Sequence, residues 1–356
     1  MRIFEQNFGR FKAKIRRAAC CSYVLAVLQE FLTEKMPKIC QKAACERLYE
    51  QALEQALRAY PESRRVPARE HKPCALFGKE ASPMEYPRIT SRRNPLAKAA
   101  AALAGSARER RERRRFLCEG ARLCRDAAES GIRLEACFFT AQAMEKYPEY
   151  LKAVLTRSKE AYEISQEVAQ LLSATKTPQG VFCVCESPAS RWENVTGLAP
   201  EGPCIVLEDI QDPGNLGTIL RTAEALGRFQ VFLLGNCCDP LSPKALRASM
   251  GAVFRLELSL ESSPERLLAL LHGRGYQTHG AVPRESARKV TEVDFSKGLH
   301  SIFIGNEGSG LRPGTAAGCG DCVTIPMRGR AESLNAAAAA TVLIWELARG
   351  ERSHGG

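Results

Sequence analysis

The chain has 356 residues, 45% hydrophobic and 26% charged, with a formal net charge of +11. This length accommodates two globular domains and an appendage, and the composition is ordinary for a soluble protein. No run approaches the ~18 consecutive apolar residues of a membrane-spanning helix, so no membrane span is expected. The excess of Lys and Arg favours polyanionic partners, although acidic small molecules or anionic lipid would satisfy the same bias.

The chain contains 15 cysteines, which are scattered through apolar segments. We interpret them as buried thiols in a reducing, cytoplasmic compartment, because disulfide frameworks belong to small secreted domains. Cys319 and Cys322 have the spacing of a metal knuckle. No second pair of that kind and no His cluster accompanies them, so no metal site is expected.

Residues 1–86 form a predicted N-terminal extension without evident chemistry. Its start is basic and then apolar, but Ser22 and Gln29 interrupt the apolar run. An amphipathic helix therefore fits better than a signal peptide. Residues 40–60 keep near-helical apolar spacing, and the Pro- and charge-rich residues 61–87 indicate a linker. The role of this extension, and whether it belongs to the mature protein, stay open.

Residues 88–186 are predicted to form a small α/β domain. Ser91 or Asn94 could cap the Ala-rich helix that opens it. Alternating apolar strands and helices predict an α/β sandwich. The predicted strands are 116–118, 134–140 and 181–185, and the predicted helices are 120–130 and 165–172.

Residues 200–350 alternate again and are predicted to form a doubly wound α/β domain. Continuous apolar strands such as CIVLEDI and QVFLLG are typical of a parallel sheet that is covered on both faces. The predicted strands are 204–210, 230–234, 254–258, 278–282, 301–304 and 322–326. The predicted helices are 217–225, 243–248, 264–272 and 334–349.

Three segments of this domain follow predicted strands, which is where ligands of open α/β sheets bind. In DPGNLGTILRTAEALG, Asn215 and Gly217 are expected in the turn and Arg221 on the first turns of the next helix. Exposed amides and an Arg at a helix start suit an anion such as an RNA phosphate. A plain turn with a surface Arg is the alternative.

The second and third segments are IGNEGSGL and IPMRGRAESLN. Glycines in the second let backbone approach a ligand closely, although the spacing is neither a dinucleotide fingerprint nor a P-loop. In the third, Glu332 and Ser333 precede an Ala-rich helix that starts near Asn335. Small residues there permit close packing, for example against a partner subunit. A structural Gly-rich turn and a plain capping segment are the alternatives.

In order and spacing, these three segments together resemble the motifs of the SpoU/TrmH family of RNA ribose 2′-O-methyltransferases, part of the SPOUT superfamily. The match covers about residues 203–349. ITSRRNPLAK, FLCEG and TPQGVF resemble the ribosomal-protein-like substrate-binding domain that often precedes the catalytic domain. Residues 1–86 have no recognised counterpart.

The resemblance implies a SPOUT-type knotted α/β methyltransferase domain, with a deep trefoil knot at its C-terminal end, in a homodimer. It implies S-adenosylmethionine as the cofactor, contacted largely through backbone. The implied cofactor positions are Gly305, Ile325 and Leu334, with Met327 nearby. The implied catalytic positions are Asn215, Arg221, Glu307, Ser333 and Asn335.

The implied reaction is methyl transfer from a sulfonium to a ribose 2′-oxygen, which needs positioning and removal of the hydroxyl proton. An Arg guanidinium stays protonated in proteins. Arg221 is therefore expected to grip an RNA phosphate and stabilise the developing oxyanion rather than act as a literal base. Asn215, Glu307 and Asn335 would hold Arg221 and the ribose, although Glu307 could equally be structural. The proton acceptor stays open, and no metal is required.

A run of arginines opens the presumed RNA-binding domain. It is either a solvated helix face paired with Glu109 and Glu112, or a contact to backbone phosphates. We favour the phosphate contact because of its position. The arginines are Arg108, Arg110, Arg111, Arg113, Arg114 and Arg115.

The predicted function is S-adenosylmethionine-dependent ribose 2′-O-methylation of RNA. The accessory RNA-binding domain favours 23S rRNA over tRNA, which stays an alternative. A non-enzymatic RNA-binding or ribosome-assembly protein is a second alternative, but Arg221 and the SLN segment are both present. A nucleotide-dependent oxidoreductase is disfavoured, because no G-x-G-x-x-G follows the first strand. The target nucleotide cannot be inferred from these motifs.

Overall fold

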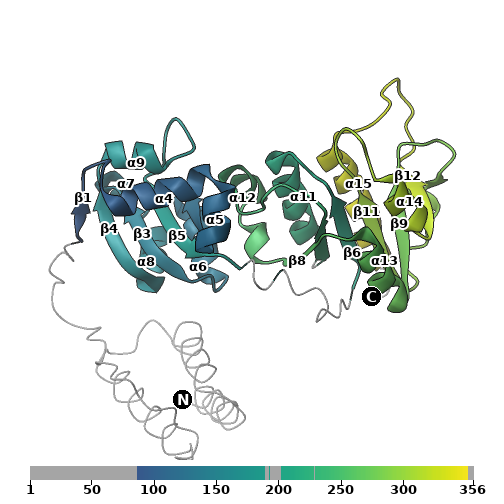
Figure 1. The fold of residues 1–356 in the computed structure, drawn as a ribbon, viewed down its shortest axis with the longest axis horizontal. Helices are drawn as coiled ribbons and strands as arrows, with labels where there is room; N and C mark the ends of the chain where they lie inside the picture. Colours follow the sequence, from purple (N-terminus) through teal and green to yellow (C-terminus); the bar gives the residue numbers. More distant parts are fainter. Residues whose placement is uncertain (1–85, 189–191, 193–201, 228, 352–356) are drawn as a thin grey trace, which may run out of the picture. The chain divides into compact units, whose positions relative to one another are not determined.

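The computed structural model describes residues 86–188, 192, 202–227 and 229–351, and all of them belong to one compact unit that begins at Pro83 (Figure 1). Two sheets organise this unit, one in each of the predicted α/β regions. The predictions made for residues 1–85 lie outside the described residues.

The first sheet has five strands in the order β1-β4-β3-β5-β2. Strand β5 runs antiparallel to β2 and β3, while β1 and β3 are both parallel to β4. Helices cover both faces, with α4 and α9 on one and α6 and α8 on the other. The strands are β1 (Arg88–Ile89), β2 (Arg115–Glu119), β3 (Leu134–Phe139), β4 (Ser158–Ile164) and β5 (Val181–Glu186). The helices are α4 (Pro95–Gly105), α5 (Ala107–Arg113), α6 (Ala121–Glu129), α7 (Ala141–Lys146), α8 (Pro148–Arg157) and α9 (Gln166–Leu172).

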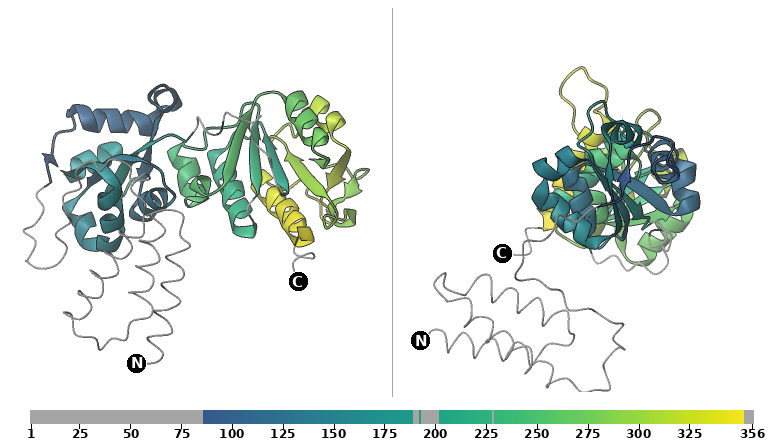
Figure 2. Two further views of the ribbon diagram at one scale, coloured as in Figure 1. Left: turned by 90° about the horizontal axis from the view of Figure 1, so that it is seen from below. Right: turned by 90° about the vertical axis from the view of Figure 1, so that its left-hand side faces the viewer.

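The second sheet has seven strands in the order β10-β12-β9-β11-β6-β7-β8, and every pair in it is parallel. Helices α11, α12 and α15 pack on one face, and α13 and α14 on the other (Figure 2). The predicted doubly wound α/β architecture is confirmed, and the trefoil knot stays a prediction.

The strands of this sheet are β6 (Cys204–Glu208), β7 (Gln230–Leu234), β8 (Glu257–Glu261), β9 (Tyr276–Ala281), β10 (Arg288–Lys289), β11 (Leu299–Ile304) and β12 (Asp321–Thr324). Its helices are α11 (Pro213–Leu226), α12 (Pro243–Ser249), α13 (Pro264–Gly273), α14 (Pro313–Gly318) and α15 (Ala336–Glu351). Two 3₁₀ turns, η3 (Ala252–Phe254) and η4 (Val290–Glu292), complete the domain.

Several predicted element boundaries were wrong for local reasons. The strand expected at 254–258 lies at Glu257–Glu261, because left-handed turns at Met250 and Gly251 lead into η3. Helix α11 begins at Pro213 instead of residue 217, since Asp212 caps it and the fixed φ of proline suits its first position. Helix α15 begins at Ala336 rather than at residue 334.

A buried ion pair joins the two sheet domains. Arg110 on α5 donates from Nε to Asp239 Oδ2 over 2.6 Å, and its Nη1 donates to the Leu103 carbonyl over 2.7 Å. The two side chains are 7% and 23% exposed. Phe116 packs against Phe254 with ring centroids 5.8 Å apart, and one hydrophobic cluster runs through both domains. The junction is therefore a packed interface.

Breaking only one side of this pair should destabilise the protein. We expect Asp239→Asn to lower the free energy of unfolding by about 3 kcal/mol, because it leaves the Arg110 charge buried without a counter-ion. The double variant Arg110→Met/Asp239→Leu should recover most of that loss, since well-packed apolar residues can replace a buried pair. Urea denaturation of the three proteins provides the measurement. Equal stability of the single variant and the wild type would contradict a buried pair.

Candidate active site

The turn after β11 is built so that its backbone folds back on itself. Asn306 and Gly310 exchange two backbone hydrogen bonds of 3.0 Å each. A Cβ on Gly305 would lie 2.2 Å from the Gly310 carbonyl carbon, so only glycine fits there. Asn306 Oδ1 accepts from the N–H groups of Gly308 and Ser309 at 2.9 and 3.0 Å. The turn therefore presents Glu307 from a fixed position.

The carboxylate of Glu307 joins this turn to the segment after β6. Its oxygens accept hydrogen bonds from the backbone N–H of Gln211 at 3.1 Å and of Asp212 at 3.0 Å. Asn215 Nδ2 donates to the same carboxylate over 3.1 Å. Asn335 Nδ2 in turn donates to Asn215 Oδ1 over 3.2 Å. One residue from each of the three sequence motifs is thus in a single hydrogen-bonded chain.

These contacts keep Glu307 ionised. Partial burial acts to raise the pKa of Glu307, but hydrogen bonds from Asp212, Gln211 and Asn215 outweigh it, and the net pKa lies below the usual value. A carboxyl group with a lowered pKa is a poor proton acceptor near neutral pH. The geometry therefore favours Glu307 as the anchor of the Asn215 segment rather than as a general base.

The start of α11 is fixed from both sides. Asp212 Oδ1 accepts from the N–H groups of Gly214 and Asn215 at 2.7 and 3.0 Å, and Lys244 pairs with its other oxygen at 2.6 Å. Asn215 and Gly217, expected in a turn, lie in the first helical turns. A Cβ on Gly217 would lie 2.5 Å from the Ala245 carbonyl oxygen, so this glycine permits the close packing of α11 on α12.

Two adjoining cavities lie at the carboxyl ends of the parallel strands. The first encloses about 660 Å³, and the second encloses about 170 Å³ beyond the ends of β9, β11 and β12. Asn306, Glu307 and Ala336 line both, so the two cavities share a wall. Asn215 and Asn335 line the first cavity. The predicted site residues that line the second cavity are Gly305, Ile325, Met327, Ser333 and Leu334.

Arg221 stands apart from this arrangement. It lies on α11, is exposed, and lines neither cavity. Within the described part of the chain it has no ion pair. The sequence also missed Gln211 and Asn306, whose backbone and side-chain groups hold the site together. Gln211 directly precedes the first motif segment and Asn306 lies within IGNEGSGL, so their place in the sequence was the signal that could have found them.

Most of the arginine run is engaged locally. Arg108 pairs with Glu112 at 2.7 Å and Arg113 pairs with Glu109 at 2.6 Å, both across one helical turn. The others with a carboxylate partner are Arg115, which pairs with Glu135, and Arg110, which pairs with Asp239. Arg111 and Arg114 have no carboxylate partner among the described residues.

Family models match both sheet domains. Residues 202–345 match the SpoU rRNA Methylase family, and residues 94–183 match an MRM3-like substrate binding domain. An uncharacterized tRNA/rRNA methyltransferase of Synechocystis sp. is 36% identical over 262 residues, which cover 73% of this chain and 93% of the relative. This chain belongs to the SpoU family. Its α/β fold is therefore that of a SPOUT RNA methyltransferase.

Two further relatives have assigned substrates. The 23S rRNA (guanosine(2553)-2′-O)-methyltransferase of Bacillus subtilis is 29% identical, with 67% of this chain and 91% of the relative covered. The 23S rRNA (uridine(2479)-2′-O)-methyltransferase of Streptomyces viridochromogenes is 30% identical, with 74% and 92% covered. An AdoMet-bound rRNA methyltransferase from Sinorhizobium meliloti has a TM-score of 0.65 and 28% identity, with 74% of this chain and 97% of that chain covered.

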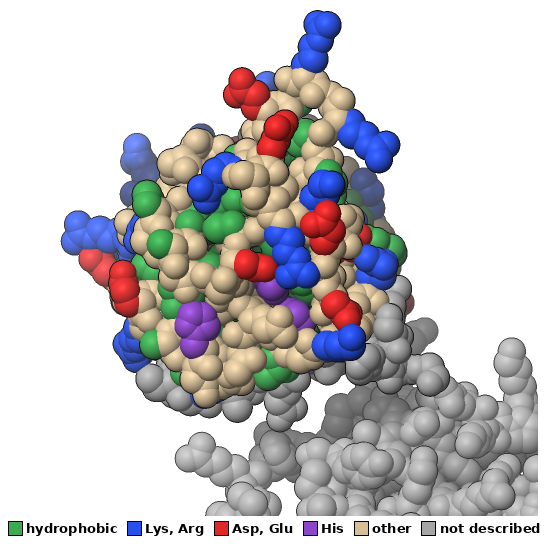
Figure 3. All heavy atoms as spheres, turned by 90° about the vertical axis from the view of Figure 1, so that its right-hand side faces the viewer, with side chains coloured by type: hydrophobic (Ala, Val, Ile, Leu, Met, Phe, Trp, Pro, Cys, Tyr) green, Lys and Arg blue, Asp and Glu red, His purple; other side chains and the backbone are tan. Residues whose placement is uncertain are grey.

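Within the described residues, no helix is both long and apolar enough to cross a membrane. The same residues contain no group of three or more His, Cys, Asp and Glu side chains placed to hold a metal ion. The cysteines among them are free thiols, and those of the first sheet domain are buried. The space-filling view of the end that carries α13 and α14 shows positive and negative side chains interspersed (Figure 3). No continuous basic surface is visible on that face.

The hydrogen bonds of Glu307 predict a pH-dependent contribution to stability. A lowered pKa means that the contribution is present above the usual value of 4.5 and is lost as pH falls through the folded-state value. Glu307→Gln keeps the shape but replaces one acceptor oxygen with a donor. We expect it to lower stability by about 1 kcal/mol at neutral pH, a modest loss because the site is exposed.

Denaturant unfolding at several pH values between neutral and acid provides the measurement. The difference between wild type and Glu307→Gln should shrink as the solution is acidified below the usual glutamate pKa. A difference that stays constant with pH would contradict an ionised Glu307 as the anchor.

Proposed function

We propose that this chain is an S-adenosylmethionine-dependent methyltransferase that methylates a ribose 2′-hydroxyl in RNA, with 23S rRNA as the favoured substrate. The shared wall of the two cavities is the observation that supports this proposal most directly. A polar cavity with carboxamide groups adjoins an apolar one, and Glu307 and Ala336 border both. A ribose in the first cavity would lie next to a cofactor in the second.

The second cavity suits a cofactor with an apolar ring and polar edges. Apolar side chains of Ile304, Ile325 and Leu343 line it together with several glycines. Met327 and Leu334 border it and are 40% and 39% exposed, which is unusual for such large apolar side chains. A bound adenosine would cover that surface, and backbone groups of the turns would meet its polar edges. The S-adenosylmethionine supplies a methyl group activated by the positive sulfur.

The polar residues would orient the acceptor. Asn215 and Asn335 present carboxamide groups at the first cavity, and the carboxylate of Glu307 fixes Asn215. Arg221 lines neither cavity of its own chain, so we propose that it acts on the acceptor bound to a second copy, where it grips an RNA phosphate and stabilises the charge that develops on the 2′-oxygen. Ser333 borders the cofactor cavity and would contact the reacting groups from that side. Positioning of this kind lowers the activation free energy, because the entropy of bringing the two reactants together is already lost when they bind.

The choice of 23S rRNA rests on the relatives and on the accessory domain. Both assigned relatives methylate ribose in 23S rRNA, but at different nucleotides, one a guanosine and one a uridine. The base preference therefore does not transfer to this chain. The exposed arginines of the run at the start of the first domain are proposed to contact RNA phosphates, whereas Arg110 is buried and pairs with Asp239.

We also propose a homodimer in a cytoplasmic setting. Val342 and Trp345 on α15 are 37% and 47% exposed, and residues three apart on a helix share a face. Helix α15 packs on α11, which carries Arg221. An interface formed through these helices would cover the apolar surface and bring a second copy close to Arg221. Light scattering of Trp345→Glu against wild type would test whether this face holds two copies together.

Methyl transfer from tritium-labelled S-adenosylmethionine tests the reaction and its acceptor. The full chain is incubated separately with unmodified 23S rRNA, 16S rRNA and tRNA. We expect label in 23S rRNA only, recovered as a ribose 2′-O-methyl nucleotide. Arg221→Ala should lower the rate by about 100-fold, because it removes an oxyanion partner. Arg157→Ala, an exposed arginine of the first domain, provides the matched control.

The other outcomes separate the alternatives. Label in tRNA alone would replace the proposed substrate, and label on a base would overturn the ribose assignment. Cofactor binding without transfer to any pool would contradict the proposed acceptors. Absence of both binding and transfer would favour a non-enzymatic RNA-binding protein.

A further inference from the structure

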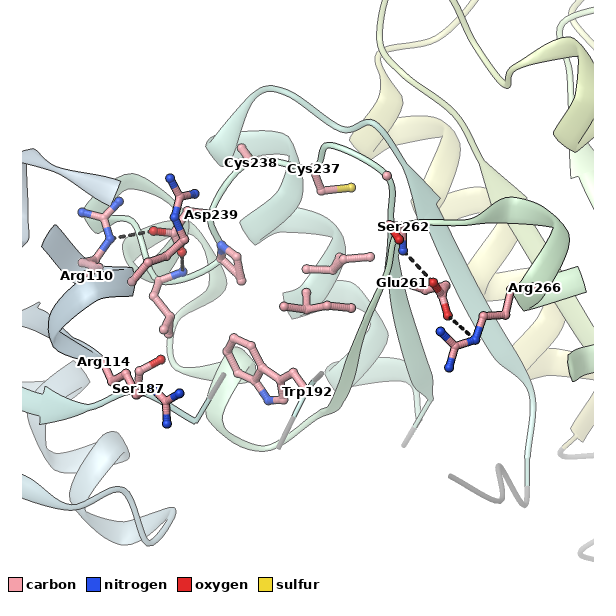
Figure 4. Close-up of a pocket in the computed structure, with 16 residues that line it drawn as sticks. Arg110, Arg114, Ser187, Trp192, Cys237, Cys238, Asp239, Glu261, Ser262 and Arg266 are labelled. Carbon is pink, nitrogen blue, oxygen red and sulfur yellow. Dashed lines mark hydrogen bonds and ion pairs between the residues drawn. The ribbon is translucent and has the colours of Figure 1, made fainter. Parts of the chain in front are cut away.

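A third cavity lies at the junction of the two sheet domains (Figure 4). It encloses about 610 Å³ between the arginine run and the carboxyl ends of β7 and β8. Arg110, Arg111 and Arg114 border it from the first domain, and Gly235 and Glu261 from the second. It is therefore separate from the two cavities that Glu307 borders.

The structure distinguishes the arginines of this cavity by their partners. Arg110 is committed to Asp239, and Arg266 on α13 pairs with Glu261 at 3.5 Å. Arg111 and Arg114 border the same space, and no described carboxylate pairs with either. Two unneutralised guanidinium groups at the rim of a cavity attract an anion, and guanidinium geometry matches phosphate.

One part of the cavity wall is apolar and includes an aromatic ring. Trp192 is 6% exposed and lies in the close-up between Arg114 and the end of β8, which carries Glu261. Leu241 and Leu260 line the same wall. A flat, apolar surface beside paired cations fits a nucleotide, because the base contacts the ring and leucines while the phosphate meets the guanidinium groups. An acidic peptide would contact only the two guanidinium groups and would leave the apolar wall without a partner.

The third cavity and the reaction site lie along one edge of the parallel sheet. Glu307 follows β11 and Asp212 follows β6, and the third cavity follows the next two strands, β7 and β8. Neighbouring strands are about 4.8 Å apart, so the strand pair β11–β6 and the strand pair β7–β8, which precede the two sites, are offset by about 10 Å along this edge. A neighbouring nucleotide of the same RNA strand spans such a distance.

The two sites are also coupled through a pair of loops. Cys238 N donates to the Ile210 carbonyl over 2.8 Å, and Gln211 Nε2 donates to the Asn236 carbonyl over 2.6 Å. Gln211 also donates its N–H to Glu307.

We propose that the junction cavity is a subsite for a nucleotide that flanks the methylated one in the RNA substrate. Arg111 and Arg114 hold its phosphate, and the wall formed by Trp192, Leu241 and Leu260 contacts its base. This proposal rests on the proposed function for the identity of the substrate. Occupation of the subsite fixes the register of the RNA relative to Asn215 and Glu307, and thereby contributes to the choice of target nucleotide.

Tryptophan fluorescence of the full chain tests this subsite without requiring methyl transfer. The sequence has 2 Trp residues, so Trp345→Phe leaves Trp192 as the only reporter. Pentauridylate and pentaadenylate are the probes, and inorganic phosphate is the competitor. We expect saturable quenching by the oligonucleotides. In Arg111→Gln/Arg114→Asn, the dissociation constant should rise by about tenfold, because two charge-assisted contacts are lost. Asn at position 114 tolerates its φ of 50°.

A charge-matched control separates this subsite from general attraction. Arg122→Ala/Arg133→Ala removes two exposed arginines of the same domain that do not border the cavity. We expect the control to change the dissociation constant by less than about twofold, since exposed charges far from a site act weakly. The salt dependence of binding should fall by about 0.7 in log–log slope for the test variant only, because one phosphate contact on a single strand contributes ~0.7.

The results that would overturn the subsite differ from those that would overturn the function. Equal weakening in both variants would show a diffuse electrostatic surface and contradict the subsite. Displacement of the oligonucleotides by phosphate at equal concentration would show an anion site without base contact. Intact methyl transfer with unchanged KM in the Arg111→Gln/Arg114→Asn variant would contradict the subsite while leaving the proposed function in place. Quenching without any methyl transfer would support the subsite and contradict the function.

Discussion

The hydrogen bonds to the Glu307 carboxylate are the constraint on which the site depends. Two backbone N–H groups and the Asn215 side chain converge on it, and they come from a segment almost a hundred positions earlier in the chain. These hydrogen bonds act together with two other links between the segment after β6 and the turn after β11: Asn306 Nδ2 donates to the Asp209 carbonyl over 2.8 Å, and Arg312 pairs with the Asp209 carboxylate at 2.6 Å. A carboxylate that is held ionised by three donors serves as a structural anchor, and it holds Asn215 and Asn335, which line the first cavity, in one hydrogen-bonded chain.

The parallel sheet makes this convergence possible. In a parallel sheet the carboxyl ends of all strands meet at one edge, so loops distant in sequence become neighbours. The second cavity follows β9, β11 and β12, the first cavity follows β11 and β6, and the junction cavity follows β7 and β8. The three cavities therefore follow one another along this edge in the order of the strands that precede them. A linear polymer lying along this edge would meet them in sequence, which is consistent with an RNA substrate.

Much of the second domain could be predicted because its strands are short, apolar and regularly spaced. The three motif segments were recognisable from sequence, and the structure brings Asn215, Glu307 and Asn335 together. Strand β4 was missed because its sequence, SKEAYEI, carries charges and is only partly buried between β3 and the short β1. Helices α7 and α8 were missed beside it, since both are short and Tyr147 alone separates the end of α7 from Pro148 at the start of α8. Propensity is weak where tertiary packing decides the structure.

Pairing of individual arginines was beyond the reach of sequence reasoning. RERRERRR indicates a basic helix, but burial of Arg110 against Asp239 depends on a contact 129 positions away. This contact gives Arg110 a structural role, whereas Arg111 and Arg114 have no carboxylate partner among the described residues and are available to bind an anion. Likewise, the sequence placed Arg221 among the motif residues, but its distance from both cavities became visible only in three dimensions.

Hydrogen–deuterium exchange at the Gln211 and Asp212 amides tests the anchoring role of Glu307 most directly. Both N–H groups donate to its carboxylate. In Glu307→Ala we predict that these two amides exchange at least about tenfold faster than in the wild type, because they lose their acceptor. Amides in the core of β6 and β7 should be unchanged, which shows that the variant is folded. Equal exchange at Gln211 and Asp212 in the two proteins would contradict the claim that Glu307 holds the site together.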